Sequence, residues 1–358
     1  MAMRAMTYRN RKIQISEVPV PEPGPGQLLV RTLACGICAS DHHYVDHPEV
    51  NAADKSGMRV DAPDRDVIMG HEFCAEIVDY GPDCQRSLPI GTRVTSIPAL
   101  IGADSMRIVG YAPDSPGGYG EYFVLTEFMA RAVPDDIPVE HIAVNDAIAV
   151  GWYYSRIGMQ HVVDRGTAHL VIGCGAIGAS VIAGLKLLGA QTIVAADYSA
   201  SRRETALALG ADVVVDPAEE SPYAVWRRAA WGSPDEVHNQ MWQMGLPSQV
   251  VYECAGVKGV LTDIIENCAA GAHILSAGGS HIDEIPSAVA HLKGLNIQWG
   301  GGPEFDDWYG CLDMIVEGRL DPRPFIGETI TLDALPDAFE RARSSSSPLR
   351  IIWKADHV

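Results

Sequence analysis

The stretch HLVIGCGAIGASVIAGLKLL, residues His169–Leu188, contains the pattern that decides the fold. An apolar run opens it, a glycine-rich turn follows, and Ile177, Val181 and Leu185 then share one face of a helix. Glycines interrupt the apolar character and Lys186 ends it, so the stretch is too short to span a membrane. A strand, a tight turn and a helix in this order predict the first half of a βαβ unit.

Alternation of apolar runs with helical patterns continues through residues 148–301. The further runs expected to form strands are 192–196, 213–215, 249–252, 274–275 and 295–299. Continuously apolar strands separated by helices are typical of a parallel sheet that is covered on both faces. We therefore predict an α/β fold with a doubly wound, six-stranded Rossmann domain.

Residues 1–147 have a different pattern, rich in Pro, Gly and short β-like runs. The clearest runs are 27–33, 75–79 and 93–97. They predict an irregular, β-rich antiparallel domain. Residues 302–358 add a helix expected over 335–343 and a strand over 349–353. Since this tail is too short to fold alone, we expect it to complete the first domain.

The glycine turn has the spacing of a dinucleotide site. Gly173, Gly175 and Gly178 form G-x-G-x-x-G between a predicted strand and a predicted helix. These glycines allow the turn, the approach of a pyrophosphate and close packing of the helix, while Ala176 and Ile177 supply backbone N–H groups at the helix N-terminus. A turn without a ligand, and a methyltransferase that binds another nucleotide, are the alternatives.

An acidic residue follows the second predicted strand of this domain. Asp197 lies 19 residues after Gly178, where a carboxylate accepts hydrogen bonds from the ribose and repels a 2′-phosphate. This favours NAD over NADP. Arg202 and Arg203 argue the other way, because an arginine here can hold that phosphate.

Composition excludes several classes of partner. Among 358 residues, 46 acidic side chains outnumber 27 basic ones, which gives a net charge of −19. Such a chain repels nucleic acid and anionic lipid, so we expect neither as a partner. The eight cysteines are scattered and the N-terminus shows no secretory signal, so we expect a cytoplasmic protein.

Two polar clusters in the first domain suggest a metal site. Residues 36–43 read GICASDHH and include Cys38, and residues 70–72 read GHE, with His71 and Glu72. Thiolate, imidazole and carboxylate are the ligands of catalytic zinc, which keeps one position open. The alternative for a His-Glu pair in a loop is an ordinary surface pair.

The stretch GHEFCAEIVDYGPDC, from Gly70 to Cys84, carries a family resemblance. With GGYGEY at residues 117–122 and the glycine turn, it resembles the zinc-dependent medium-chain alcohol dehydrogenases over essentially the whole chain. Ala75 departs from the pattern, where the family has glycine. The resemblance implies a GroES-like catalytic domain beside the dinucleotide domain.

The resemblance also implies roles for particular residues. Cys38 and His71 match two zinc ligands, Asp146 is the candidate third, and Glu72 matches a residue that binds or approaches the metal in part of the family. Asp41 matches the carboxylate that orients the ligand histidine. The alternative for Asp146 is a helix N-cap.

A proton path is implied as well. Ser40 matches the hydroxyl that accepts the proton of the substrate, and His43 matches the imidazole at the outer end, with His42 as the competing residue. Cys35 completes C-x-x-C with Cys38 and is interpreted as packing. Many relatives hold a second, structural zinc with four cysteines, but residues 98–116 contain none, so we predict one zinc per chain.

We therefore predict a zinc- and NAD-dependent oxidoreductase that interconverts a primary or secondary alcohol and an aldehyde or ketone. The alternatives are a zinc-free NAD(P)H-dependent reductase of activated double bonds or quinones, and a non-catalytic dinucleotide-binding protein. Four apolar residues, Ile97, Pro98, Trp152 and Trp299, favour a small neutral substrate. Residues 44–65 form a segment longer and more polar than usual in the family. The resemblance implies a homodimer or homotetramer.

Overall fold

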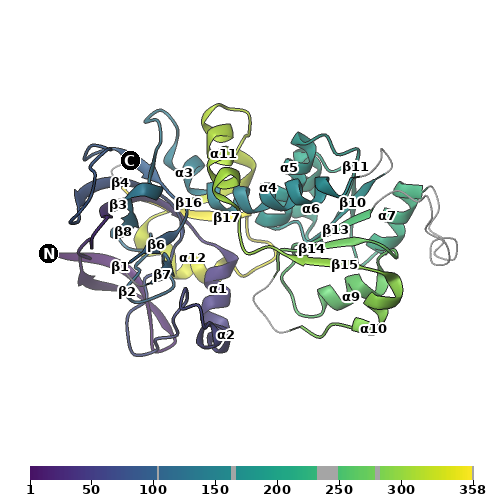
Figure 1. Cartoon of the computed structure of the whole chain (residues 1–358), viewed down its shortest axis with the longest axis horizontal. Coiled ribbons are helices and arrows are strands. Elements are labelled where there is room, and N and C mark those ends of the chain that lie inside the picture. Colours follow the sequence, from purple (N-terminus) through teal and green to yellow (C-terminus); the bar gives the residue numbers. More distant parts are fainter. Residues whose placement is uncertain (103–104, 163–166, 232–248, 279–282, 357–358) are drawn as a thin grey trace. The chain divides into compact units, whose positions relative to one another are not determined.

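The computed structural model describes residues 1–102, 105–162, 167–231, 249–278 and 283–356. The chain folds into two compact units (Figure 1). Unit 1 comprises residues 1–146 and 310–358, and unit 2 comprises residues 147–309. The sequence placed these boundaries after residues 147 and 301.

Unit 2 is built on a six-stranded sheet in which every neighbouring pair of strands is parallel. Its strands, in sheet order, are β12 (Val213–Val215), β11 (Thr192–Ala196), β10 (Ala168–Ile172), β13 (Gln249–Glu253), β14 (His273–Ser276) and β15 (Asn296–Trp299). This confirms the predicted doubly wound sheet. The order reverses between β10 and β13, and dinucleotides bind at the carboxyl ends of strands at such a point.

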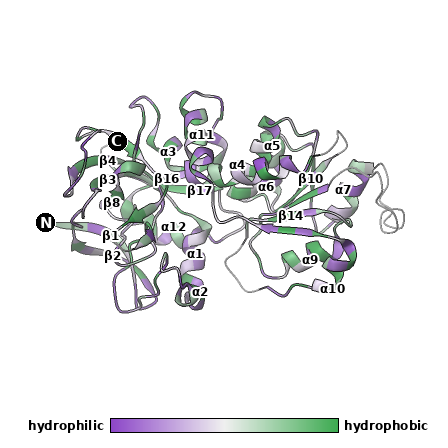
Figure 2. Cartoon of the chain, viewed as in Figure 1, coloured by the Kyte–Doolittle hydropathy of each residue, from purple (hydrophilic) through white to green (hydrophobic). Residues whose placement is uncertain are grey.

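Helices cover both faces of this sheet. They are α4 (Asn145–Gln160), α5 (Ala176–Leu187), α6 (Ala200–Leu209), α7 (Pro222–Trp231), α9 (Val260–Asn267) and α10 (Ser287–Lys293). Successive residues of β10 alternate between the faces: Leu170 packs in a core with Trp226 of α7, and Val171 packs in a core with Leu185 of α5. The four central strands β11, β10, β13 and β14 are therefore buried on both sides, whereas the edge strand β15 is mostly exposed. Figure 2 shows hydrophobic residues along α9, whose Ile264 is also buried.

Unit 1 is mainly antiparallel. Its large sheet has the order β16 (Ile326–Ile330), β17 (Arg350–Lys354), β3 (Gln27–Gly36), β4 (Glu72–Tyr80), β5 (Arg93–Thr95) and β9 (Arg131–Ala132), and β8 (Tyr122–Thr126) also pairs with β3. Two smaller sheets are β1 (Ala2–Arg9) with β2 (Lys12–Pro19), and β6 (Ala99–Ile101) with β7 (Met106–Ile108). β5 ends at Thr95, two residues before the predicted end at 97.

Short helices connect these strands. They are α1 (Ala39–Asp46), α2 (Pro48–Ala53), η1 (Glu127–Met129), α3 (Val139–Ala143), η2 (Arg323–Phe325), η3 (Leu332–Ala334) and α12 (Leu335–Arg341), and α11 (Phe305–Val316) precedes the last of them. The C-terminal strand β17 pairs with β3, with Ile352 opposite Gly36. The tail thus completes the sheet of unit 1. No helix among the described residues has the length and apolarity that a membrane span requires.

Candidate functional site

The end of β3 and the start of α1 place one group of predicted residues in unit 1. Cys38 precedes the first residue of α1 in an extended conformation, and its backbone N–H lies 3.2 Å from Oδ2 of Asp41. A carboxylate that accepts a backbone N–H in this way fixes the first turn of a helix. Ser40 and Asp41 are therefore held close to the Cys38 thiol.

The GHE segment lies beside this turn because β4 begins at Glu72, which pairs with Gly36 at the end of β3. Gly70 adopts a φ of +96°, and a Cβ atom there would lie 2.8 Å from Sγ of Cys35 and 2.6 Å from the ring of Tyr119. Only glycine fits this position, which explains the first letter of the motif.

The structure brings Cys38, His71 and Glu72 together. One ligand atom from each lies within 4.8 Å of those of the other two; the imidazole and carboxylate are buried and Cys38 is half-buried. A thiolate, an imidazole nitrogen and a carboxylate oxygen are the donors that zinc prefers. The residues present therefore fit a zinc ion.

Asp41 faces the other nitrogen of the His71 ring. Its Oδ1 lies 3.2 Å from Nδ1, and both side chains are buried. Burial alone would lower the pKa of His71, but the charges of Asp41 and Cys38 outweigh it and raise that pKa well above its usual value. Tyr119 donates to Oδ2 of Asp41 at 2.6 Å, which fixes the carboxylate. This is the arrangement in which a carboxylate orients a metal-binding histidine.

Glu72 forms an ion pair that the sequence did not reveal. Arg350 of β17 donates to both carboxylate oxygens of Glu72, each at 2.7 Å, and its Nη2 lies 3.6 Å from Sγ of Cys38. Burial would lower the pKa of Arg350, but Glu72 and then Cys38 outweigh it and raise that pKa. Glu72 and Arg350 are 278 positions apart in the sequence and lie on β4 and β17, the two strands that flank the end of β3. No sequence pattern links them.

Asp146 lies outside the group formed by Cys38, His71 and Glu72 among the described residues. It sits in the first turn of α4, and its charge contributes to the raised pKa of Arg350. Its role as a zinc ligand stays a prediction.

Ser40 lies against two of the grouped side chains. Its Oγ donates to Sγ of Cys38 at 3.1 Å and lies 3.2 Å from Nε2 of His71. Tyr111 donates its own hydroxyl hydrogen to the same Oγ at 2.8 Å. Burial raises the pKa of Tyr111 well above its usual value, so this hydroxyl keeps its proton. The sequence analysis missed Tyr111, which stands in the cysteine-free segment 98–116.

The two candidate histidines differ in their surroundings. His43 is half-buried on α1 and its ring stacks on that of His47, with the centroids 5.8 Å apart. His42 is buried, with Nε2 2.8 Å from the carbonyl oxygen of Phe339, and its ring contacts the ring of that residue at a tilt of 50°. His42 is therefore a packing residue, which leaves His43 as the candidate for the outer end of a proton path.

The glycine turn of unit 2 follows β10. Gly173 has a φ of +91°, and a Cβ atom there would lie 2.7 Å from the backbone nitrogen of Ala255 in the loop after β13. A Cβ atom on Gly178 would overlap the carbonyl oxygen of Gly173. Both positions therefore require glycine, as the motif predicts.

The first turn of α5 follows at once. Gly175 is the N-cap, so Ala176 and Ile177 stand where backbone N–H groups are free of helical partners. Nη1 of Arg202 lies 4.0 Å from the position that a Cβ atom on Gly175 would occupy. Free N–H groups and a guanidinium beside a glycine turn form a suitable site for a pyrophosphate.

Asp197 is buried directly after β11 and is tied to the glycine turn. Its Oδ2 accepts the backbone N–H of Cys174 at 2.8 Å, and its Oδ1 accepts that of Ser199 at 2.8 Å. Each carboxylate oxygen retains a lone pair, so the group can still accept ribose hydroxyls. Nη1 of Arg203 donates to the carbonyl oxygens of Asp197 and Tyr198. This part of its guanidinium is therefore engaged by the backbone of the protein.

Glu253 is a further buried carboxylate at the same edge of the sheet that the sequence analysis missed. Its Oε1 accepts the N–H groups of Ala255 and Gly256, and its Oε2 accepts those of Gly278 and the hydroxyl of Ser276. It therefore joins the loops that follow β13 and β14.

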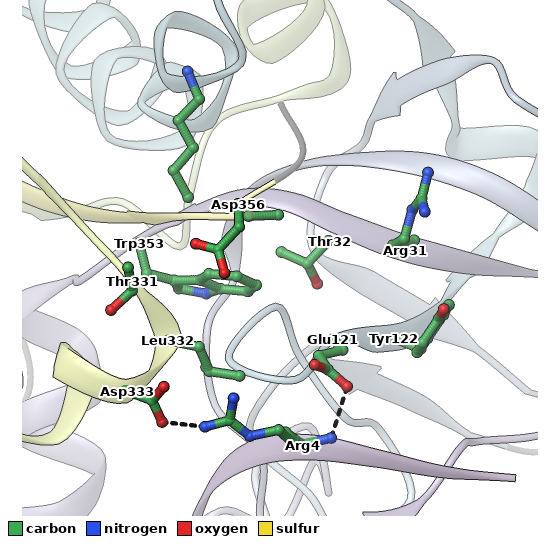
Figure 3. A pocket seen from close by; sticks show the side chains of 12 residues that line it. Arg4, Arg31, Thr32, Glu121, Tyr122, Thr331, Leu332, Asp333, Trp353 and Asp356 are labelled. Atoms are coloured by element: carbon green, nitrogen blue, oxygen red, sulfur yellow. Dashed lines mark hydrogen bonds and ion pairs between the residues drawn. The ribbon is translucent and has the colours of Figure 1, made fainter.

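One cavity of about 300 Å³ lies elsewhere in unit 1 (Figure 3). Its cationic residues are already paired: Arg4 with Asp333, Arg31 with Glu76, and Lys354 with Glu140. Because these six charged groups form three ion pairs, the cavity offers no unpaired cation among its described residues that would bind a ligand, and we assign none to it.

Comparison with known proteins defines the class. Residues 24–135 match the model of the alcohol dehydrogenase GroES-like domain, and residues 176–317 match that of the zinc-binding dehydrogenase domain. Together these two domains define the zinc-binding dehydrogenases.

Similar proteins agree over nearly the full length. Rat sorbitol dehydrogenase is 26% identical over 96% of this chain and 93% of its own, and L-threonine 3-dehydrogenase of Sinorhizobium medicae is 28% identical over 96% and 97%. The crystal structure of 2R,3R-butanediol dehydrogenase from Bacillus subtilis superimposes with a TM-score of 0.78 at 26% identity, covering 99% of this chain and all of that one. The chain belongs to the family of zinc-dependent medium-chain dehydrogenases, which are oxidoreductases.

Proposed function

We propose that this protein catalyses the zinc- and NAD-dependent interconversion of a small primary or secondary alcohol and the corresponding aldehyde or ketone. The observation that carries the proposal is the group formed by Cys38, His71 and Glu72, with the Ser40 hydroxyl in contact with two of its members. The similar proteins named for sorbitol, threonine and butanediol all act on substrates that carry a hydroxyl group, which supports an alcohol substrate.

Cys38 and His71 would hold the zinc, with Asp146 as the predicted third ligand and Glu72 close by. Bound zinc supplies Lewis acidity, which favours negative charge on an alcohol oxygen. Asp41 faces Nδ1 of His71 at 3.2 Å, which would direct Nε2 toward the metal. We expect one zinc per chain, because residues 98–116 lack the cysteines of a second site.

Ser40 is proposed to accept the substrate proton at Oγ. Tyr111 donates to that oxygen and therefore keeps the Ser40 hydrogen directed away from itself. His43 is proposed as the outer member of the path, since an imidazole exchanges protons with water near neutral pH.

The cofactor is proposed to be NAD. The turn formed by Gly173, Gly175 and Gly178 would take the pyrophosphate with Arg202, and Asp197 would accept the ribose hydroxyls. A buried carboxylate at this place repels the 2′-phosphate of NADP.

We also infer a cytoplasmic location and a homodimer or homotetramer. The eight cysteines are free in the structure, which supports a reducing compartment. The oligomer rests on the family alone.

The test is turnover of a panel of alcohols and carbonyl compounds, followed by the absorbance of NADH. We expect oxidation of at least one alcohol by the purified protein, loss of activity on removal of metal by a chelator, and recovery on addition of zinc. Binding of NADH, followed by its fluorescence, serves as the control and should survive the chelator, because the glycine turn lies in unit 2. Activity that persists without metal would contradict the proposal.

A further inference from the structure

One arginine near the grouped ligands, Arg59, forms no salt bridge with any described residue. Arg59 is half-buried, and its guanidinium carbon lies 5.1 Å from the centre of the Tyr111 ring. It forms no salt bridge and no side-chain hydrogen bond with any residue that the structure describes. Among all described residues, most arginines form ion pairs, as expected in a chain where acidic residues outnumber basic ones.

The backbone around Arg59 is firmly attached to unit 1. The carbonyl oxygen of Met58 accepts the N–H of Ile108 at 3.0 Å, and the N–H of Val60 donates to the carbonyl oxygen of Tyr111 at 2.9 Å. The Tyr44 hydroxyl donates to the carbonyl oxygen of Val60 at 2.6 Å. Arg59 is thus held from both sides, and its place beside Tyr111 is a built feature of the fold.

The nearby acidic residues Asp54 and Asp61 contact backbone N–H groups or another arginine and not the Arg59 side chain. Asp54 accepts the backbone N–H groups of Ser56 and of Arg59 itself, each at 2.9 Å. Asp61 lies 3.8 Å from Arg11. Neither carboxylate forms a salt bridge with the guanidinium of Arg59, although Asp54 lies close enough for its charge to interact with that of Arg59.

Tyr111 connects this charge to the candidate metal site. Its ring contacts both the guanidinium of Arg59 and the His71 ring, whose centroid is 5.2 Å away, and its hydroxyl donates to Oγ of Ser40. A half-buried cation gains from the face of a tyrosine but is only partly compensated by it. Arg59 therefore places a positive charge, without a salt bridge to any described residue, beside a tyrosine that contacts the candidate metal site.

We propose that Arg59 binds an anionic group of the substrate, so that the preferred substrate is an alcohol that also carries a carboxylate or a phosphate. This rests on the proposed function and adds the substrate class. A guanidinium binds either anion through two parallel hydrogen bonds, which a neutral group cannot match. The inference differs from the neutral substrate predicted from Ile97, Pro98, Trp152 and Trp299, and the experiment below decides between them.

The experiment compares three probes of equal carbon number: erythritol, erythronate and erythritol 4-phosphate. For each, kcat/KM with NAD is measured for the wild type, Arg59→Gln and Arg59→Lys. We expect the wild type to prefer an anionic probe over erythritol, and Arg59→Gln to lower kcat/KM for that probe by about 10–100-fold. Arg59→Lys should recover part of the loss, since it retains the charge without the planar fork.

Arg86→Gln is the matched control. Its guanidinium also lies over a tyrosine ring, at 5.2 Å from the centre of Tyr80, and it has no salt bridge with the described residues. This variant should keep the wild-type ratio between anionic and neutral probes. A wild type that prefers erythronate indicates a substrate with a carboxylate, and one that prefers erythritol 4-phosphate indicates a substrate with a phosphate.

Binding of the two anionic probes to the NADH complex, followed by calorimetry, gives a readout that does not need turnover. If none of the probes is oxidised, the proposed reaction fails for them, and calorimetry still decides the role of Arg59. Binding of an anion that weakens at least 10-fold in Arg59→Gln supports the inference. Equal binding by wild type and Arg59→Gln, or a wild type that prefers erythritol, overturns it.

Discussion

The Tyr111 hydroxyl is the clearest example of a single group that the structure adds to the candidate site. It donates to Oγ of Ser40, the atom proposed to accept the substrate proton. Its ring stacks on that of Tyr44, at 5.0 Å and nearly parallel, which holds the hydroxyl in place. The proposed proton path thus includes a contact from a residue far from the motif of Ser40.

Replacement of Tyr111 by phenylalanine removes this one donor and keeps the ring. We expect Tyr111→Phe to lower kcat by about 2–10-fold, the amount that one hydrogen bond contributes, with a smaller change in KM. Steady-state kinetics over a range of pH measures both constants. Tyr44→Phe is the control, because it loses a hydrogen bond to Val60 and leaves Ser40 untouched. Equal values of kcat for the two variants would show that the Tyr111 hydroxyl only stabilises the fold.

Asp197 allows a second test at the same scale. Asp197→Ser should lower kcat/KM for NAD by about 10–100-fold through the loss of charged hydrogen bonds to the ribose, and should raise the NADP/NAD ratio of this constant. Part of the loss will come from the glycine turn, since Cys174 also donates to this carboxylate. Asp212→Ser is the control, because Asp212 accepts a backbone N–H of Ile193 elsewhere in unit 2. A wild type that uses both cofactors equally would contradict the assignment.

At the scale of elements, strands β4 and β17 bring Glu72 and Arg350 to opposite sides of the end of β3. Both side chains are buried, and the pair uses both oxygens of the carboxylate. A buried ion pair loses much stability when one partner is removed, because the other charge remains without compensation. The pair therefore has a structural role that is separate from metal binding.

Two variants separate these roles. Glu72→Gln should lower the free energy of unfolding by about 3–5 kcal/mol and leave zinc bound, because Arg350 loses its partner while Cys38 and His71 remain. Asp146→Asn should instead weaken zinc binding. Denaturant titration gives the stability and elemental analysis gives the metal. Loss of zinc in Glu72→Gln together with full zinc in Asp146→Asn would make Glu72 the third ligand.

Strands β10 and β13 provide a pH-dependent pair in the other unit. His169 is buried with Nδ1 3.1 Å from the Tyr252 hydroxyl, and burial lowers its pKa from 6.5 to about 4. The unfolded chain therefore binds a proton more readily than the folded one. The stability that neutral His169 contributes is complete above about pH 6.5 and is lost as the pH falls toward 4.

His169→Gln should remove that part of the pH dependence, because glutamine does not titrate. We expect the wild type to lose up to about 3 kcal/mol more than the variant between pH 6.5 and 4, as follows from a shift of this size. Denaturant titrations at several pH values measure the difference. Parallel curves for the two proteins would show that His169 keeps its ordinary pKa in the fold.

At the scale of the whole molecule, local patterns predicted most of the fold. Apolar runs and the glycine turn were enough for the parallel sheet of unit 2, because each βαβ unit is specified by neighbouring residues. The pairing of β17 with β3 follows from long-range packing, so the sequence suggested only that the tail would return to the first domain.

Residues of the candidate site that belong to a short motif could be predicted from the sequence. Residues that come from distant segments of the chain could not. Cys38, His71 and Glu72 belong to short motifs, and the structure groups them. Arg350, Tyr111 and Arg59 reach the same region from distant segments without a motif. Contacts of this kind depend on strand register and loop anchoring, which composition and spacing do not record.

The zinc content of the purified protein tests the central claim most directly. Elemental analysis after expression in zinc-supplemented medium should give one zinc per chain for the wild type. Cys84→Ser, which changes another half-buried cysteine of unit 1, should keep that value, whereas Cys38→Ser should lose the metal and still bind NADH. Two zinc ions per chain, none in the wild type, or full zinc in Cys38→Ser would contradict the account.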